Sequence, residues 1–442
     1  MTARHSKILL SLALAAGLAG CGLFKEAQSR TPVLGERVAV LGAEVEVGID
    51  ATTAALPFAL PAPRANEDWA QSGGNAPKSM GHLALNPDPQ LAWRQSAGAG
   101  STDAARLIST PVVAGGRVFT IDTRGIVRAF DAASGALQWA TGTASDASDR
   151  DALYGGGVAF GNGRLYATNG LGNVVALDPA SGAVAWTVRP AGPLRGAPTF
   201  DGTHLYVTTQ DNQLLALRPA DGSTEWRATA ALEVAGVFGN AAPAAGRGTV
   251  VAGFSSGELN AYRYENGRLL WQDALARTSM STSVSALSDI DADPVIDSGQ
   301  VIAVGQGGRM VALDILSGQR LWELSLAGTS TPTVAGDWVF VVTDRAQVLA
   351  IARETGRVRW INQLPRFKNE EKRRGAFYYA GPVLAAGKLW VAGSNGALIE
   401  IDANSGRFVR QRDVGEPLAL PPVVAGGTLY LLGEDGGLHA YR

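Results

Sequence analysis

Cysteine is almost absent from this chain of 442 residues, in which Cys21 is the only thiol. A lone cysteine can neither close a disulfide within the chain nor supply the thiolates of a zinc site. Histidine is nearly as rare, and its four occurrences are scattered without metal-ligand spacing. The sequence therefore offers no disulfide framework and no metal cluster built on these two residue types.

An excess of positive charge is also missing, since 38 Lys and Arg residues face 40 Asp and Glu residues. Proteins that bind nucleic acid through its phosphates carry a basic patch or stripe, so no nucleic-acid partner is expected. Beyond Cys21 no apolar run reaches the roughly 20 residues that a membrane-spanning helix needs.

The residues before Cys21 have the features of a secretory leader. Residues 1–7 hold two basic residues and no acidic one, and residues 8–19 form an apolar run too short to span a bilayer. The end of this run, LAGC at 18–21, resembles the bacterial lipobox, in which the cysteine is lipidated. The resemblance implies a signal peptide over 1–20, lipid attachment at Cys21 and an anchor on the periplasmic face of the outer membrane. An ordinary signal peptide with a chance cysteine is the alternative.

Residues 21–65 lack Trp and Tyr and end in a Pro-rich stretch. This composition predicts an extended tether, which would average roughly 35–40 Å end to end as a flexible chain. One part, RVAVLGAEVEVGI (37–49), alternates like a strand. Docking of this part on the main domain is therefore the alternative.

Glycine is abundant, with 55 residues, and it recurs in an internal repeat. The frame Ala-x-Asp-x-x-Ser-Gly-x-x-x-Trp ends at Trp139, Trp186 and Trp322, and weaker copies end at Trp226, Trp271 and Trp360. A seventh copy has Arg410 in the tryptophan position. Successive tryptophans lie 38 to 51 residues apart, the length of a four-stranded propeller blade. We expect these tryptophans to pack between neighbouring blades rather than to stack on a ligand.

The two ends of the repeat region predict a closed ring. The eighth copy stops at Arg442, before its fourth strand, whereas Trp93 lies 46 residues before Trp139 with no complete blade in front of it. Residues 89–96 are therefore expected to supply the missing strand. The sequence predicts an all-β, eight-bladed β-propeller of four-stranded blades over residues 66–442, closed by an N-terminal strand that completes the last blade.

The repeat frame resembles that of the pyrroloquinoline quinone (PQQ) dehydrogenases, and DWAQSGGNA (68–76) resembles the start of their propellers. The resemblance raises an enzyme as a hypothesis, because those proteins hold Ca²⁺ and the quinone with a Glu, an Asn and an Asp. No such set stands out in the sequence, and Ca²⁺ needs six to eight oxygen ligands. Turn amides account for the aspartates of the frame, which are Asp131, Asp178, Asp314 and Asp402. We expect no cofactor, metal or catalytic residue; a PQQ-dependent dehydrogenase or another periplasmic ligand-binding propeller is the alternative.

A lipobox, a tether and an eight-bladed propeller of PQQ-like repeats together resemble the BamB family of lipoproteins, which belong to the outer-membrane β-barrel assembly complex. The resemblance is strongest over residues 228–322 and includes a loop with Leu287, Ser288, Asp289 and Asp291. In that family this loop helps to bind the periplasmic POTRA domains of the barrel protein BamA. A second family contact, Leu-x-Leu-Arg-Gly, is expected at residues 232–236, with Leu232 and Val234 in the leucine positions and no Arg.

The resemblance implies a non-enzymatic scaffold that aids the folding and insertion of outer-membrane proteins. Its implied partners are a BamA-type barrel protein, contacted through the POTRA domains, and the other lipoproteins of the assembly complex. Nascent outer-membrane proteins are a further implied partner.

The residues alone also single out the loop at 272–294. It makes the interval between its flanking tryptophans the longest between complete frames, and long loops on rigid scaffolds commonly carry function. Its aspartates do not form an EF-hand calcium loop, because Pro294 and Gln300 stand where that loop needs Gly and Glu. The alternative is that Asp289 and Asp291 only cap turns.

A second candidate loop, PRFKNEEKRRGAFYYAGP (365–382), mixes charges with aromatic residues. Arg373, Arg374 and Tyr378 are its candidate contacts, because Arg and aromatic residues are enriched in protein interfaces. A solvated charged turn followed by a buried strand is the alternative. The link at 231–243 is apolar for a loop, which indicates either a sticky patch or packing on the ring.

Overall fold

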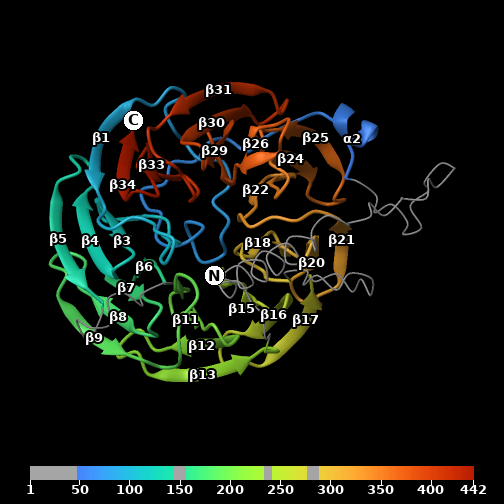
Figure 1. Ribbon diagram of the computed structural model, residues 1–442. Coiled ribbons are helices and arrows are strands. Elements are labelled where there is room, and N and C mark those ends of the chain that lie inside the picture. The colour runs from blue at the N-terminus through green and yellow to red at the C-terminus, as the bar shows by residue number, and fades with distance from the viewer. Residues whose placement is uncertain (1–46, 144–155, 233–240, 276–287) are drawn as a thin grey trace, which may run out of the picture. The chain divides into compact units, whose positions relative to one another are not determined.

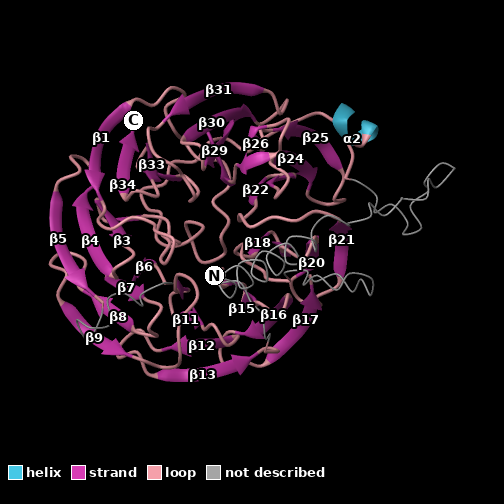
Figure 2. Cartoon of the chain, in the orientation of Figure 1, coloured by secondary structure: helices cyan, strands magenta, loops and turns pink. Residues whose placement is uncertain are grey.

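A computed structural model describes residues 47–143, 156–232, 241–275 and 288–442. Eight four-stranded antiparallel sheets follow one another around a ring, and the colours in Figure 1 run round it in sequence order. Figure 2 shows that strands and loops make up nearly all of these residues. No helix in the described ranges has the length and hydropathy to cross a bilayer. The predicted all-β, eight-bladed β-propeller is confirmed.

The strands of each blade follow chain order from the inside of the ring outwards, with one exception in the last blade. Blades 1 and 2 consist of β2 (Val112–Ala114), β3 (Arg117–Ile121), β4 (Ile126–Asp131), β5 (Leu137–Gly142), and of β6 (Val158–Gly161), β7 (Arg164–Thr168), β8 (Val174–Leu177), β9 (Val184–Val188). Blades 3 and 4 consist of β10 (Thr199–Phe200), β11 (Leu205–Thr208), β12 (Gln213–Leu217), β13 (Thr224–Thr229), and of β14 (Ala244–Gly246), β15 (Thr249–Gly253), β16 (Glu258–Arg263), β17 (Leu269–Ala274). Blades 5 and 6 consist of β18 (Val295–Asp297), β19 (Gln300–Val304), β20 (Met310–Asp314), β21 (Arg320–Leu324), and of β22 (Thr333–Ala335), β23 (Trp338–Val342), β24 (Gln347–Ala352), β25 (Val358–Gln363). Blades 7 and 8 consist of β28 (Tyr379–Ala385), β29 (Lys388–Gly393), β30 (Ala397–Asp402), β31 (Phe408–Asp413), and of β32 (Val423–Ala425), β33 (Thr428–Leu432), β34 (Gly437–Tyr441), β1 (Leu91–Ser96).

The aspartate of the repeat frame caps the turn before the outermost strand. Asp178 Oδ1 accepts hydrogen bonds from the backbone amides of Ala180 and Ser181, at 3.1 and 2.8 Å, and from the Ser181 hydroxyl at 2.7 Å. These bonds hold the pKa of Asp178 below its ordinary value, and the Ser181 hydroxyl is the largest cause. A bond to the amide of the serine three residues on is also made by Asp131, Asp314 and Asp402. The turn role expected for these residues is confirmed.

The outermost strand of seven blades carries a tryptophan that joins it to the next blade. Trp271 Nε1 donates to the carbonyl of Ile315 in blade 5 at 2.8 Å, and its ring lies over Gly318. An indole bond to the next blade is also made by Trp93, Trp139, Trp186, Trp226, Trp322 and Trp360. Because each tryptophan can bury about 150–250 Å², these side chains hold neighbouring blades together, as the sequence predicted.

The contact between Trp271 and Gly318 gives a direct test of this junction. We expect Gly318→Ala to lower the free energy of unfolding by about 2–4 kcal/mol, because a Cβ there would lie 2.6 Å from Trp271 Cγ. Gly163→Ala is the matched control, since both glycines have φ of +71° and a Cβ at Gly163 meets nothing within 4 Å. The control should cost only about 1 kcal/mol, the backbone part of the penalty. Equal losses in urea titrations of the two variants would contradict tryptophan docking as the cause.

The ring closes through the N-terminal strand β1. It pairs antiparallel with β34, and Trp93 lies opposite Ala440. Trp93 Nε1 donates to the carbonyl of Ala132 in blade 1 at 3.2 Å, so this borrowed strand also makes the usual contact with the next blade. The predicted closure by residues 89–96 is confirmed.

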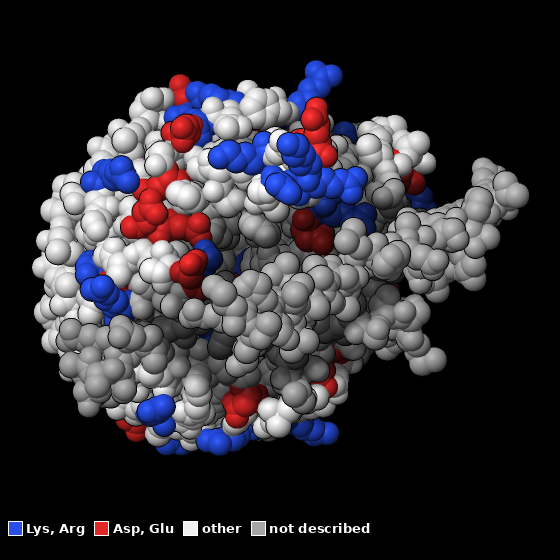
Figure 3. Space-filling view, in the orientation of Figure 1, with Lys and Arg blue, Asp and Glu red and all other residues white. Residues whose placement is uncertain are grey.

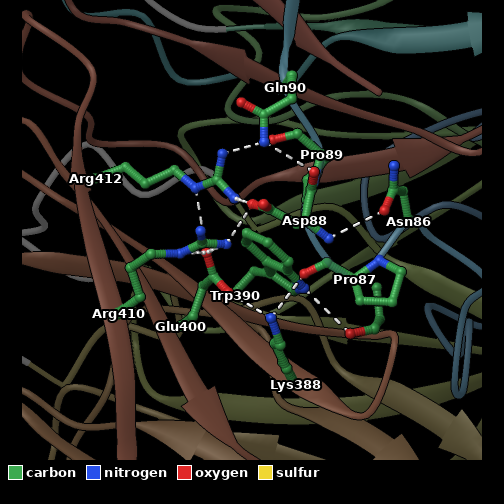
Figure 4. Close-up of polar contacts among 11 residues, drawn as sticks. Asn86, Pro87, Asp88, Pro89, Gln90, Lys388, Trp390, Glu400, Arg410 and Arg412 are labelled. Atoms are coloured by element: carbon green, nitrogen blue, oxygen red, sulfur yellow. Dashed lines mark hydrogen bonds and ion pairs between the residues drawn. The ribbon is translucent and has the colours of Figure 1, made fainter.

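The junction from blade 7 to blade 8 has a different chemistry. In the other blades an alanine lies opposite the tryptophan, as Ala312 lies opposite Trp322, but in blade 7 Glu400 lies opposite Arg410. The Glu400 side chain has no exposed surface and binds Arg410 at 2.9 Å and Arg412 at 3.2 Å. Ion pairs therefore replace the tryptophan at this junction, as Figure 4 shows.

Two further residues complete this ion-pair cluster. Lys388 Nζ lies 2.7 Å from Glu400 Oε2. Asp88, in the stretch that leads into β1, binds Arg410 at 2.8 Å and Arg412 at 2.6 Å. These arginines, Arg410 foremost, lower the pKa of Asp88. Asp88 thus occupies the junction at which the other blades present a glycine turn.

Part of the predicted tether packs on the propeller. Asp50 caps α2 (Ala51–Ala55) by accepting the Thr53 amide hydrogen bond at 2.7 Å. Phe58 stacks on Trp338 of blade 6, with ring centroids 5.2 Å apart. The described part of this segment, residues 47–65, therefore lies against blade 6.

The segment from residue 50 to residue 83 contacts every blade. Its hydrogen bonds join Trp69 to Val113 in blade 1, Ala70 to Phe160 in blade 2, Gln71 to Phe200 in blade 3, Ala76 to Ala245 in blade 4, Pro77 to Ile296 in blade 5, Asp50 to Val358 in blade 6, Leu83 to Leu384 in blade 7 and Asn66 to Gly426 in blade 8. We call residues 50–83 the inner segment. It cross-links the ring independently of the tryptophans.

Candidate partner-binding site

Asp289 and Asp291 lie in the stretch that enters β18, the first strand of blade 5. This stretch is tied to blade 4, because the Ser288 hydroxyl donates to the carbonyl of Ser255 at 3.1 Å and the Ile290 amide donates to that of Phe254 at 3.3 Å. It is the last part of the loop at 272–294 that the sequence analysis singled out. Its conformation therefore sets where that loop rejoins the ring.

Arg195 holds both aspartates. It lies in the stretch that enters β10 of blade 3, and its Nη2 is 2.6 Å from Asp289 Oδ1 and 3.5 Å from Asp291 Oδ1. The side chains of Arg195, Asp289 and Asp291 are 1%, 2% and 8% exposed. This buried triad joins the inner ends of blades 3 and 5. Turn capping alone, the alternative for these aspartates, does not account for the ion pairs that they form with Arg195.

The two carboxylates of the triad differ in their electrostatic setting. Burial, and after it the neighbouring charge of Asp289, raise the pKa of Asp291 to about 7 against the opposing effect of Arg195. The side-chain amide of Gln306 donates a hydrogen bond to Asp291 Oδ2. One arginine thus offsets two adjacent buried acids.

A second buried pair, Lys78 and Asp293, lies close to the triad in sequence and in space. Lys78 Nζ donates to the Ser72 carbonyl at 2.9 Å and to the Thr199 hydroxyl at 3.0 Å, while Asp293 accepts from the Ser72 hydroxyl at 2.6 Å. Burial lowers the pKa of Lys78 to about 8 and raises that of Asp293, and each charge opposes the shift of the other. The pair fixes the inner segment to blades 3 and 5.

A cavity of about 320 Å³ lies at the inner ends of the blades. Its lining includes Lys78, Asp291, Asp293, Tyr378 and Tyr379. Among the described residues no three His, Cys, Asp or Glu side chains are grouped so that they could hold a metal ion. The acidic groups of the cavity are instead engaged by Arg195 and by the Lys78 network.

Arg373, Arg374 and Tyr378 belong to a hairpin inserted between blades 6 and 7. Its strands are β26 (Phe367–Asn369) and β27 (Arg374–Ala376). Both arginines are exposed, and Tyr378 is 72% exposed at the edge of the cavity. Figure 3 shows basic side chains gathered over β26. Tyr378, which follows the strands of this hairpin, therefore lines the same cavity as Asp291.

The remaining predicted residues are Leu232, Val234, Leu287 and Cys21. Leu232 is 72% exposed after β13, the outermost strand of blade 3. Val234, Leu287 and Cys21 lie outside the described residues. Their predicted roles stay predictions.

Arg195 is the residue that the sequence analysis missed. Residues 194–196 read Leu-Arg-Gly, the end of the Leu-x-Leu-Arg-Gly motif that was assigned to residues 232–236. The assignment to residues 232–236 stays a prediction, while a Leu-Arg-Gly arginine is present about 40 residues upstream, at the inner end of blade 3. The tripeptide Leu-Arg-Gly was the signal in the sequence that could have identified Arg195.

Eight four-stranded blades, docked by tryptophans in Ala-x-Asp-x-x-Ser-Gly-x-x-x-Trp repeats, define a β-propeller of the PQQ-like repeat class. The family model for outer membrane protein assembly factor BamB matches residues 82–152, 123–362 and 366–442. The chain belongs to this family.

Individual relatives support the assignment over part of their length. The chain is 32% identical over 205 residues to outer membrane protein assembly factor BamB of Salmonella typhimurium and 31% identical over 205 residues to that of Escherichia coli. Each match covers 46% of this chain and 50% of the relative, so the chain spans about half the length of these curated relatives.

Two solved structures show the same fold. BamB from Moraxella catarrhalis matches with a TM-score of 0.67 and 19% identity, over 80% of this chain and 99% of that chain. A europium-containing methanol dehydrogenase matches with a TM-score of 0.66 and 13% identity, over 85% and 89%. At these identities the likeness concerns the fold alone.

Proposed function

We propose that this chain is a non-enzymatic scaffold lipoprotein that takes part in outer-membrane protein assembly. In this proposal it is anchored through Cys21 on the periplasmic face of the outer membrane. It binds the POTRA domains of a BamA-type barrel protein and works beside the other lipoproteins of the complex. Membership of the BamB family supports the proposal.

The buried triad of Arg195, Asp289 and Asp291 is the observation that supports a particular binding site for this proposed function. Because Asp289 is 2% exposed, its carboxylate acts by holding its own stretch of chain rather than by lying on the outer surface. The triad holds the part of the loop at 272–294 that includes Ser288, whose hydroxyl also donates to the carbonyl of Ser255. We assign the contact with the POTRA domains to that loop, with the triad as its support.

The test is recovery of the barrel protein from detergent-solubilised membranes with tagged chain. We expect wild type to recover a POTRA-containing barrel and Asp289→Asn/Asp291→Asn to recover at least tenfold less. The asparagines keep the size of the side chains but remove the charges that bind Arg195. Recovery is measured by quantitative mass spectrometry, beside a thermal melt of each purified variant.

Glu265→Gln/Glu354→Gln is the matched control, because it removes two charges from exposed turns on other blades. The control should recover as much barrel as wild type. Absence of any POTRA-containing protein from the wild-type sample would reject the scaffold function. Equal recovery with both double variants would keep the function and reject this site.

A further inference from the structure

The hairpin between blades 6 and 7 concentrates positive charge. Residues 366–376 hold five cations and two acids, in a chain whose net charge is −2. The five cations are exposed: Arg366, Lys368, Lys372, Arg373 and Arg374. No other link between consecutive blades carries strands of its own in the ranges that the structure describes. We call residues 366–376 the basic hairpin.

The five cations of the basic hairpin are not paired with nearby acids. None of them forms an ion pair with a described residue, whereas Arg410 and Arg412 at the blade 7 junction are both paired. Glu370 Oε1 accepts the backbone amides of Arg366 and Phe367 at 2.7 and 3.0 Å instead of pairing with a cation, and five cations against two acids leave the hairpin with an excess of positive charge. Like charges so close together repel one another, so a bound anionic group would relieve this repulsion.

The basic hairpin leads straight into the lining of the cavity. Its last residues continue through Tyr378, which is 72% exposed, to the buried Tyr379 at the start of β28. Tyr379 Oη donates to the carbonyl of Pro365 at 2.8 Å and so ties the base of the hairpin to the cavity wall. An anionic ligand on the hairpin would therefore lie beside an exposed aromatic ring and a space of about 320 Å³.

We infer that the basic hairpin and Tyr378 form a binding site for an acidic, extended segment of another polypeptide. Charge complementarity selects an acidic ligand. A polypeptide fits better than an anionic bilayer, because it can place carboxylates on the hairpin and an apolar side chain against Tyr378 and the cavity, whereas a bilayer surface cannot enter a cavity. The site is distinct from the proposed POTRA contact, although Asp291 lines the same cavity as Tyr378, and it does not depend on the assembly proposal.

The probe is a fluorescent twelve-residue peptide of alternating Glu and Ser with one central Leu, titrated with the full chain in neutral detergent. We expect Lys372→Gln/Arg373→Asn/Arg374→Gln to weaken binding at least tenfold. Asn is chosen at 373 because that residue has φ of +48°, which Asn tolerates. The control Arg124→Gln/Arg268→Gln/Arg407→Gln removes three exposed cations elsewhere and should bind within twofold of wild type.

Two further measurements complete the test. Tyr378→Ser should weaken binding of the Leu peptide and leave unchanged that of a peptide with Ser in place of Leu. Three results would overturn the inference: no binding of the Leu peptide, equal losses in the hairpin and control variants, or binding of phosphatidylglycerol vesicles without binding of the peptide. Near-ultraviolet circular dichroism of each variant confirms that the blades remain folded.

Discussion

Glu400→Gln is expected to lower the free energy of unfolding by about 3–5 kcal/mol, because it leaves three cations without their shared buried carboxylate. Lys388, Arg410 and Arg412 all bind Glu400, whose side chain has no exposed surface. Asp88 remains for the two arginines, but it is 59% exposed and its ion pairs are screened by solvent. The loss falls on the junction between blades 7 and 8, because the outermost strand of blade 7 has Arg410 in place of the docking tryptophan.

Urea unfolding at low and high salt measures this effect. Glu434→Gln is the control, since it breaks the surface pair of Glu434 with Arg106 and should change stability by less than about 1 kcal/mol. We also expect proteolysis of the Glu400→Gln variant to begin near β1, because Asp88 in the stretch that leads into this strand binds the arginines of the junction. A loss as small as that of the control would show that the ion-pair cluster does not stabilise the ring.

Arg195→Met is expected to have the second large effect, a loss of about 3–5 kcal/mol at neutral pH. The substitution leaves Asp289 and Asp291 adjacent and buried without their shared cation. Burial already raises the pKa of Asp291 to about 7. The folded state therefore holds a proton that the unfolded state has lost above about pH 4, and stability falls as the pH rises from there towards the folded pKa.

Thermal melts at pH 5 and pH 8 measure this prediction. The Arg195→Met variant should lose more stability at pH 8 than at pH 5, because protonation at the lower pH relieves the repulsion between the two acids. Arg124→Met, at an exposed arginine, should lose little at either pH. A loss independent of pH would assign the effect of Arg195 to packing instead of charge.

The propeller could be predicted because its determinants are local and repeated. Each complete frame carries its turn residues and its tryptophan within eleven residues, and the position of Trp93 pointed to a borrowed strand. The role of Glu400 could not be predicted, because its pairing with Arg410 depends on strand register, and the pairing of Arg410 with Asp88 depends on ring closure.

The candidate site was predicted only in part, because some of its residues lie in one loop and their partner lies far away in sequence. Asp289 and Asp291 stood out in one loop, but their partner Arg195 lies 94 residues from Asp289 in sequence and meets it only across the ring. The burial of these acids depends on neighbouring blades, which no single stretch of sequence specifies.

The inner segment has a consequence for the order of folding. A hydrogen bond joins Asn66 to Val424, 358 residues later, and β1 pairs with β34 at the other end of the chain. During synthesis the part made first must wait, unpaired, until the part made last is available. The eight blades can form one by one from local contacts. The ring becomes a single cooperative unit only when the residues synthesised first pair with those synthesised last.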